Sequence, residues 1–205
     1  MLSLREQLLY FLNYWFSSFD DPLQWFSPRA KSRDKHLKLK YLSLHNTFSK
    51  MSLREIYKFI EKNDNDYRLF LSIIILLDQV SRQIYRNSCN AFTQDTVARR
   101  LSRRFIKFYN LKDINLYYFC FIVVVFEHSE NVADHLFIKK ILQERINENN
   151  RHEYKTLREM MVYLDKHTDV LIDFGYYPKR KMVCGKKLSQ KDLLYIHTQN
   201  IGQPF

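Results

Sequence analysis

Asp78, Arg82 and Arg86 recur at four-residue intervals in the string Leu-Leu-Asp-Gln-Val-Ser-Arg-Gln-Ile-Tyr-Arg. On a helix, residues four apart share a face, and an aspartate four residues before an arginine is in the favoured order for an ion pair. A guanidinium group can also hold a phosphate or carboxylate through two parallel hydrogen bonds. Two interpretations follow: a salt-bridge network that ties helices together, or an anion site in which Asp78 orients the arginines.

A histidine and a glutamate end the most apolar stretch of the chain. His128 and Glu130 follow the run 116–126. Residues two apart do not share a helix face, but at a helix end both side chains can turn into one cleft. Imidazole and carboxylate groups serve as general acids and bases. The segment is therefore either a capped helix end or a candidate catalytic pair.

A third polar segment lies near the C-terminus. His167 precedes the string Phe-Gly-Tyr-Tyr-Pro-Lys-Arg-Lys, in which Gly175 is expected to end a helix and an aromatic-rich turn presents Arg180. No regular ligand spacing joins His128, Glu130, Asp78 and His167, so we predict no metal site. No glycine-rich phosphate loop and no Gly-x-Ser-x-Gly elbow is present, and we predict no cofactor.

Together these segments resemble a known family. The chain contains, in order, Leu-Leu-Asp-Gln-x-x-Arg-x-x-Tyr-Arg, Ala-Phe-x-x-Asp, His-Ser-Glu and His-x-Asp-x5-Gly-x-x-Pro-x-Arg. This order and spacing resemble the bacterial family catalogued as domain of unknown function 924, which is grouped with tetratricopeptide-like helical proteins. The resemblance runs from Trp15 to Phe205. It implies a compact helical fold and no assigned activity.

The resemblance also implies a set of recurrent polar positions. They are Asp78, Gln79, Arg82, Arg86, Asp95, His128, Glu130, His167 and Arg180. The chain departs from the usual family pattern at Ser81, where the family has proline, at Asn87, where it has glycine, and at Tyr176, where it has arginine. Because the recurrent positions come from distant segments, we expect them to converge in one polar pocket.

A stripe of cations marks one further helix. It consists of Arg99, Arg100, Arg103, Arg104 and Lys107, with Asp95 as the nearest acid. Few aromatic residues interleave with the stripe, so base stacking is not indicated there. The stripe is either a solvated helix face or a surface for a polyanion.

Helix signals run through the whole chain. Ser3 and Ser52 each precede a Leu-Arg-Glu sequence, which predicts a capping box. Three glycines and four prolines leave few breaks between helices. The run 116–126 would also suit a buried strand, but no partner strand is indicated, so we predict a helix. Further helices are expected to begin near Pro28, Asp66, Thr93, Asn131, His152 and Ser189. We therefore predict an all-α fold: a single domain, residues 1–205, of roughly eight or nine antiparallel helices with tetratricopeptide-like packing.

Composition narrows the setting of the chain. Hydrophobic residues make up 46% of its 205 residues, enough for a core, and the formal net charge is +11. Such a charge favours anionic partners. Near the N-terminus, charged residues lie where a signal peptide needs an apolar run. The longest apolar runs of the chain are shorter than the roughly 20 residues that a membrane-spanning helix needs. We therefore expect a cytoplasmic protein without a membrane partner.

Two hypotheses of function remain from the sequence. In the first, a polar pocket either only binds a small anionic ligand or also transforms it. The candidate catalytic residues are His128 and Glu130, and the candidate ligand-binding residues are Asp78, Gln79, Arg82, Arg86, His167 and Arg180. In the second, a non-enzymatic module binds RNA or an acidic protein through Arg99, Arg100, Arg103, Arg104 and Lys107. The residues name neither a reaction nor an oligomeric state.

Overall fold

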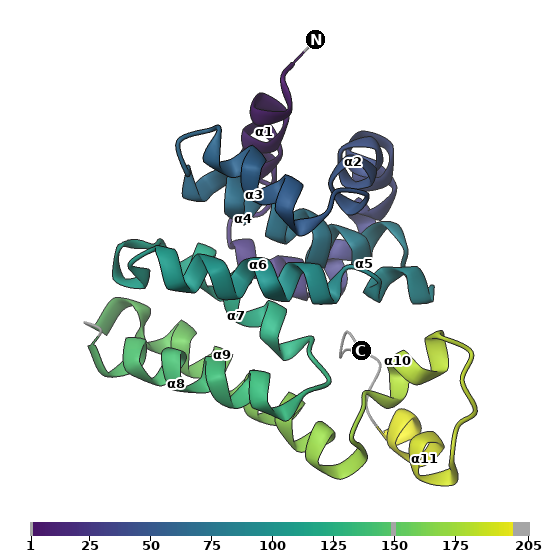
Figure 1. The fold of residues 1–205 in the computed structure, drawn as a ribbon. Helices are drawn as coiled ribbons and strands as arrows, with labels where there is room; N and C mark the ends of the chain where they lie inside the picture. The colour runs from purple at the N-terminus through teal and green to yellow at the C-terminus, as the bar shows by residue number, and fades with distance from the viewer. Residues whose placement is uncertain (1, 149–150, 199–205) are drawn as a thin grey trace. The chain divides into compact units, whose positions relative to one another are not determined.

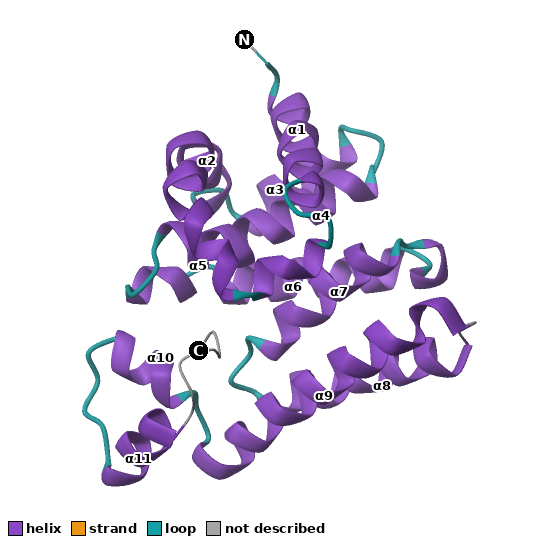
Figure 2. Ribbon diagram, turned by 180° about the vertical axis from the view of Figure 1, so that it is seen from behind, coloured by secondary structure: helices purple, strands orange, loops and turns teal. Residues whose placement is uncertain are grey.

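The fold is all-α. The computed structural model describes residues 2–148 and 151–198, and it has no strand in these ranges (Figure 2). The chain forms two compact units, Met1–Asn110 and Leu111–Phe205. The single domain and the tetratricopeptide-like packing that the sequence predicted both stay predictions. None of the described helices is both long enough and apolar enough to cross a membrane. Gly202 and Phe205, at the end of the family resemblance, lie outside the described residues.

Unit 1 is built around one continuous helical segment that changes its hydrogen-bond pattern midway. Its first part is α-helical, its middle is a π-helical turn and its last part is α-helical again, and it packs against α1, α2 and α6 (Figure 1). The helices of this unit are α1 (Leu4–Ser17), α2 (Asp34–Ser49), α3 (Leu53–Glu61), α4 (Tyr67–Ile75), the π-turn (Leu76–Val80), α5 (Ser81–Ile84) and α6 (Asp95–Phe108), with 3-10 turns at Pro22–Phe26, Pro28–Arg33 and Cys89–Phe92.

The apolar segment 69–77 is the core of unit 1. Every residue of this run is buried, so the segment needs partners on all sides. Trp15 of α1 stacks on Trp25 with ring centroids 3.9 Å apart, and the Trp25 indole donates a hydrogen bond to the main-chain oxygen of Trp15. These contacts hold the connection between α1 and α2 against the core.

Unit 2 consists of an apolar helix, a helical hairpin and a smaller pair of helices. The elements are a 3-10 turn (Leu111–Asp113), α7 (Leu116–Glu127), α8 (Val132–Glu148), α9 (Arg151–Phe174), α10 (Pro178–Val183) and α11 (Gln190–Thr198). Helices α8 and α9 pack side by side, α7 packs on both, and α10 packs on α11 (Figure 1). The run read as either strand or helix is therefore the helix α7, as predicted, and most of it is buried.

Most predicted helix starts agree with the structure. Both capping boxes are present, with Ser3 and Ser52 accepting from the N–H groups of Glu6 and Glu55. Thr93 was a wrong start, because α6 begins at Asp95. The segment after Pro28 first forms a 3-10 turn before α2 begins. The short helix α10 was missed, although Pro178 stands at its first position, where proline is favoured.

Candidate functional site

In unit 1, Arg82 joins two carboxylates. Its Nη1 donates to Asp78 Oδ1 at 3.2 Å and to Asp95 Oδ1 at 2.9 Å, and its Nη2 donates to Asp95 Oδ2 at 3.1 Å. The Asp78 side chain is fully buried. Gln79 donates to the other oxygen of Asp78 at 2.5 Å. The predicted residues Asp78, Gln79, Arg82 and Asp95 are thus brought together as a buried ion-pair network between the π-turn, α5 and α6.

The π-turn positions this network. A π-turn interrupts the regular hydrogen-bond ladder of an α-helix and is frequent at functional sites. Arg82 Nη1 donates to the main-chain oxygen of Asp78 at 2.9 Å, and the Ser81 hydroxyl donates to that of Leu77 at 2.6 Å. The buried His45 ring of α2 lies with Nε2 2.7 Å from the Ser81 Oγ. The Ser81 hydroxyl proton is used in the bond to the Leu77 main-chain oxygen. In the bond between His45 and Ser81, the donor is therefore the Nε2–H group of His45 and the acceptor is the Ser81 Oγ.

Arg86 turns to a different partner. It forms a two-pronged ion pair with Asp34 at the start of α2, in which Nη2 lies 2.9 Å from Oδ1, and it also donates to Gln83. The helix α5 ends at Ile84, so Arg86 does not continue the face that carries Arg82. The two arginines each meet a carboxylate, and the structure does not bring them together as two forks for one anion.

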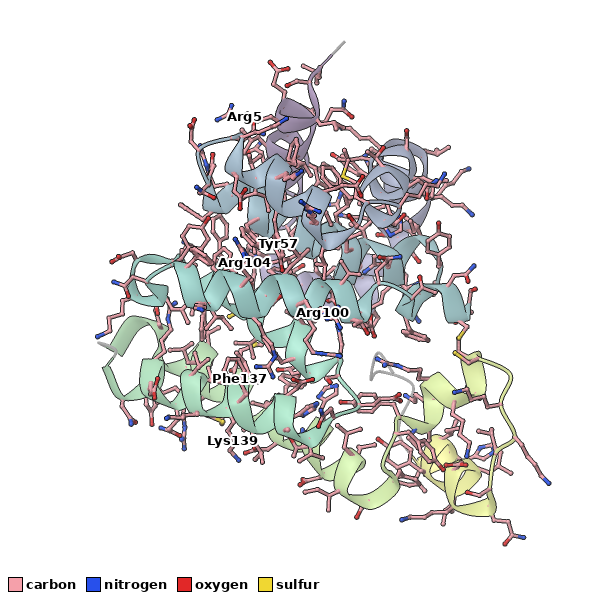
Figure 3. The ribbon with its side chains drawn as sticks, viewed as in Figure 1. Arg5, Tyr57, Arg100, Arg104, Phe137 and Lys139 are labelled. Carbon is pink, nitrogen blue, oxygen red and sulfur yellow. The ribbon has the colours of Figure 1, made fainter. Side chains whose placement is uncertain are left out.

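The cations of α6 do not form a uniform surface. Arg104 lies over the Tyr57 ring of α3 at 4.2 Å and over the Phe108 ring at 4.6 Å, and its Nη2 is 3.5 Å from Glu61 (Figure 3). Arg99, Arg100, Arg103 and Lys107 lie on the same helix, with Arg100, Arg103 and Lys107 exposed. The predicted polyanion surface on α6 stays a prediction, and Arg104 has part of its charge neutralised by Glu61.

In unit 2, the start of α10 closes the end of α7. The Tyr177 hydroxyl donates to the main-chain oxygen of Glu127 at 2.5 Å, and Arg180 Nη2 donates to that of His128 at 2.8 Å. The last carbonyl groups of a helix have no hydrogen-bond partner within the helix and carry a partial negative charge. A hydroxyl donor and a cationic guanidinium donor therefore stabilise them. In return, Glu130 accepts from the Tyr177 N–H at 2.8 Å.

Neutral histidines surround this junction. The pKa of His167 is lowered to about 4, mainly by burial and to a smaller extent by the nearby His128 and His135. Its Nδ1 lies 2.7 Å from the main-chain oxygen of Tyr163, which fixes the neutral ring with its proton on Nδ1. Burial also lowers the pKa of His135. The His167 ring meets the Tyr177 ring edge-on at 5.9 Å. The His167 and His135 rings are therefore uncharged at neutral pH.

A small hollow opens beside this junction. Its volume is about 190 Å³, and its lining residues are Glu130, Tyr176, Arg180, Lys181, Cys184 and Lys186. Three of the six carry a positive charge and one carries a negative charge. Pockets for drug-sized ligands usually measure about 300–1,000 Å³, so this hollow suits a smaller molecule. Glu130 and Arg180 are residues that the sequence singled out.

A buried aspartate holds one of these cations in place. Lys181 donates to Asp192 Oδ2 at 2.8 Å and to the Tyr176 hydroxyl at 2.9 Å, and that hydroxyl donates to Asp192 Oδ1 at 2.9 Å. The hydrogen bond to Asp192 raises the pKa of Lys181. Hydrogen bonds from Lys181 and the Ser189 N–H keep the pKa of Asp192 well below its usual range. Lys181 therefore presents a fixed ammonium group beside Tyr176, the position at which the family resemblance implies an arginine.

The structure thus divides the predicted site residues between the two units. One group lies around Tyr177 in unit 2 and consists of Glu130, His128, His167 and Arg180. The other group lies in unit 1 and consists of Asp78, Gln79 and Arg82. Convergence of all three segments stays a prediction. Tyr177, His135, Lys181 and Asp192 were missed by the sequence analysis. In the described residues, no group of three or more His, Cys, Asp and Glu side chains is arranged to hold a metal ion.

The role of Tyr177 in closing α7 can be measured. We expect Tyr177→Phe to lower the free energy of unfolding by about 1–2 kcal/mol, because the main-chain oxygen of Glu127 loses its donor in a buried place. Urea unfolding followed by circular dichroism measures the change. Tyr163→Phe is the matched control, since the Tyr163 ring of α9 is 52% exposed. Equal effects of the two substitutions would contradict this role.

Comparisons with known proteins agree with these observations at the level of the fold. The family model described as "Bacterial protein of unknown function (DUF924)" matches residues 11–200. A solved structure, that of the protein of unknown function ATU0120 from Agrobacterium tumefaciens, is similar with a TM-score of 0.77 and 17% sequence identity, over 96% of this chain and 99% of that one. At this identity the likeness shows the fold alone. No curated protein matches the chain.

Proposed function

We propose that this chain, which belongs to the bacterial family of unknown function DUF924, binds a small anion in the hollow beside α10. The observation that carries the proposal is the excess of positive charge in that lining. Arg180, Lys181 and Lys186 face the hollow together with Glu130 as its single acid. The net charge of +11 would favour the approach of an anion to any such site.

Each of the three cations would contribute in its own way. Arg180 is anchored by the main-chain oxygen of His128, and Lys181 by Asp192, so both groups are ordered before a ligand arrives. Such order lowers the entropy lost on binding. Lys186 is exposed and forms no ion pair within the described part of the chain. Its ammonium group is therefore the one that would gain a partner when an anion binds.

Glu130 narrows the class of ligand. An ionised carboxylate accepts hydrogen bonds but does not donate them, so it would repel an anion that offers nothing else. Glu130 uses Oε1 to accept from Tyr177, and its Oε2 lies 3.9 Å from Arg180 Nη1. A ligand that carries an O–H or N–H group next to its anionic group would suit both kinds of lining residue. We therefore propose a small hydroxy or amino acid, or a hydroxylated phosphate ester.

A catalytic role would fall to Glu130 rather than to His128. Glu130 lines the hollow, and His128 is not among its lining residues. A carboxylate that accepts a proton from the ligand hydroxyl would act as a general base. The binding of an anion is the proposal that is tested first, because every such role depends on it.

The test is a thermal-shift titration at low ionic strength with inorganic phosphate, acetate and glycolate. A ligand that binds the folded state stabilises it, by about 2.7 kcal/mol at a concentration one hundred times the Kd. Glycolate should stabilise the protein at lower concentration than acetate, because it adds the hydroxyl that Glu130 can accept from.

Two lysine variants make the titration specific. Lys186→Ala should weaken binding about fivefold, the loss expected for an exposed charge pair of about 1 kcal/mol. Lys187→Ala removes the same charge from the next residue, which is exposed and does not line the hollow, and should leave binding unchanged. Absence of stabilisation by all three anions, or equal losses in the two variants, would refute the proposal.

A further inference from the structure

The first turns of α2 and the 3-10 turn before it are rich in cations. The segment 29–40 contains Arg29, Lys31, Arg33, Lys35, Lys38 and Lys40, and the sole acid of α2 is Asp34. Asp34 is already paired with Arg86. Lys35, Lys38 and Lys40 are exposed, and none of them forms an ion pair with a described residue. The charge of this face is therefore not neutralised within the described chain, unlike that of Arg104 on α6.

Aromatic rings of α1 lie beside one of these lysines, Lys40. The Lys40 Nζ is 4.7 Å from the centre of the Tyr10 ring and 5.3 Å from that of the Tyr14 ring. The His36 ring of α2 stacks on Tyr14 at 5.2 Å with an interplanar angle of 27°. Tyr10 is 55% exposed. Helices α1 and α2 are in contact within unit 1, and Lys40 and His36 of α2 therefore share one surface with Tyr10 and Tyr14 of α1.

Further along α2 the same face has a shallow depression whose lining is mostly uncharged. A shallow depression of about 430 Å³ is lined by Leu42, Ser43, Asn46, Thr47 and Lys50. Positions 35, 39, 43, 46 and 50 repeat at helical spacing, so the depression continues the line of the basic face. Its hydroxyl and amide groups both donate and accept hydrogen bonds. They could pair with neutral polar edges as well as with charged groups.

We infer that the α1–α2 face, defined by Tyr10, Tyr14, Lys35, His36 and Lys40, binds single-stranded nucleic acid. Surfaces that hold single strands combine cations along the phosphate backbone with aromatic rings on which bases stack. Both are present here: the exposed lysines of α2, and the Tyr10 ring, which is 55% exposed. The site is separate from the small-anion hollow and does not depend on it.

The composition of the face favours nucleic acid over a membrane surface. Helices that lie in a membrane interface need a broad apolar side opposite their charged side. The inward side of α2 is taken by the core, and the outward side offers Leu39, 79% exposed, as its one strongly exposed large apolar residue. A single leucine among lysines is a poor anchor. Stacked rings and hydrogen-bonding amides are of more use to bases than to lipid chains.

The test measures the binding of a fluorescein-labelled, mixed-sequence single-stranded RNA by anisotropy over a range of salt concentrations. For a single strand, the slope of log affinity against log salt is about −0.7 for each phosphate contact. The double variant Lys35→Ala/Lys40→Ala should therefore bind about tenfold more weakly at low salt, with a slope shallower by about 1.4. Tyr10→Ala should weaken binding at least fivefold, with an unchanged slope, because stacking carries no counterion release.

The matched control removes two exposed cations from α6. Arg100→Ala/Lys107→Ala should bind RNA within twofold of the unaltered chain, and Lys186→Ala should do the same. If the α6 variant loses affinity and the α2 variant keeps it, the surface is misassigned and the inference fails. It also fails if the RNA does not bind at low salt, or if vesicles of phosphatidylserine bind and RNA does not. Circular dichroism melting of each variant separates lost binding from lost folding.

Discussion

Arg82→Ala is expected to lower the free energy of unfolding by about 3–5 kcal/mol, the usual loss when one partner of a buried ion pair is removed. The guanidinium of Arg82 bonds to Asp78 and Asp95, and the Asp78 carboxylate is fully buried. Without the arginine, two carboxylates would remain close to one another with less compensation. Guanidinium chloride unfolding followed by circular dichroism measures the effect. Arg100→Ala, on the exposed side of α6, should change stability by less than about 0.5 kcal/mol.

A second substitution separates charge from packing. Asp95→Asn placed in the Arg82→Ala background removes one of the two carboxylates that lost their partner. It should therefore restore part of the lost stability, although the same substitution alone should destabilise the chain. If Arg82→Ala instead folds with unaltered stability and loses affinity for small anions, Arg82 is a ligand-binding residue and the structural interpretation is wrong.

The second large effect is a loss of stability in mild acid. The folded chain holds His167 neutral down to a pH of about 4, whereas a histidine in an unfolded chain takes up its proton near pH 6.5. Between these values the unfolded state binds more protons, so the free energy of unfolding falls as the pH falls. The contribution of His167 is present above about pH 6.5 and lost by about pH 4, and it amounts to about 3 kcal/mol at most.

The measurement compares two pH profiles of stability. Urea unfolding of the unaltered chain and of His167→Gln at several pH values between 7 and 4 gives the two curves. Other titrating groups, including the buried His45 and His135, remain in both proteins, so the difference between the curves isolates His167. The difference should shrink as the pH falls through this range. Parallel curves would show that the ring is not kept neutral by the fold.

The sequence predicted the helices well because their signals are local. The capping boxes at Ser3 and Ser52 and the long apolar run before Asp78 depend on residues within a few positions of each other. The family was also identified from its motifs, and the match to residues 11–200 confirms it. Helix α10 was missed because its six residues follow Gly175, which has a positive φ of 75°. Such a segment looks like a turn unless Pro178 is read as a helix start.

The candidate site was harder to predict because it depends on contacts between distant segments. Arg180 was identified by its motif, but its partner, the main-chain oxygen of His128, lies 52 positions away. A main-chain oxygen has no sequence signal at all. Asp192 and Lys181 form their pair through the packing of α10 on α11, and neither of these two residues belongs to a recognised motif. The four-residue spacing predicted that Arg82 and Arg86 share one helix face. Helix α5 ends at Ile84, before Arg86, so this prediction was wrong.

The π-turn at Leu76–Val80 has a consequence for how this chain can change over evolutionary time. A π-turn accommodates about one residue more than an α-helix of the same length. Loss of one residue here would restore the ordinary helix and leave the helix beyond it facing nearly as before, because the wider turn already takes up the rotation of about 100° that one residue adds. Arg82 would then still face Asp95, and Ser81 would still face His45. The same loss in a regular α-helical part of the segment would rotate these side chains away from their partners, so we expect a change of length among relatives to fall at the π-turn.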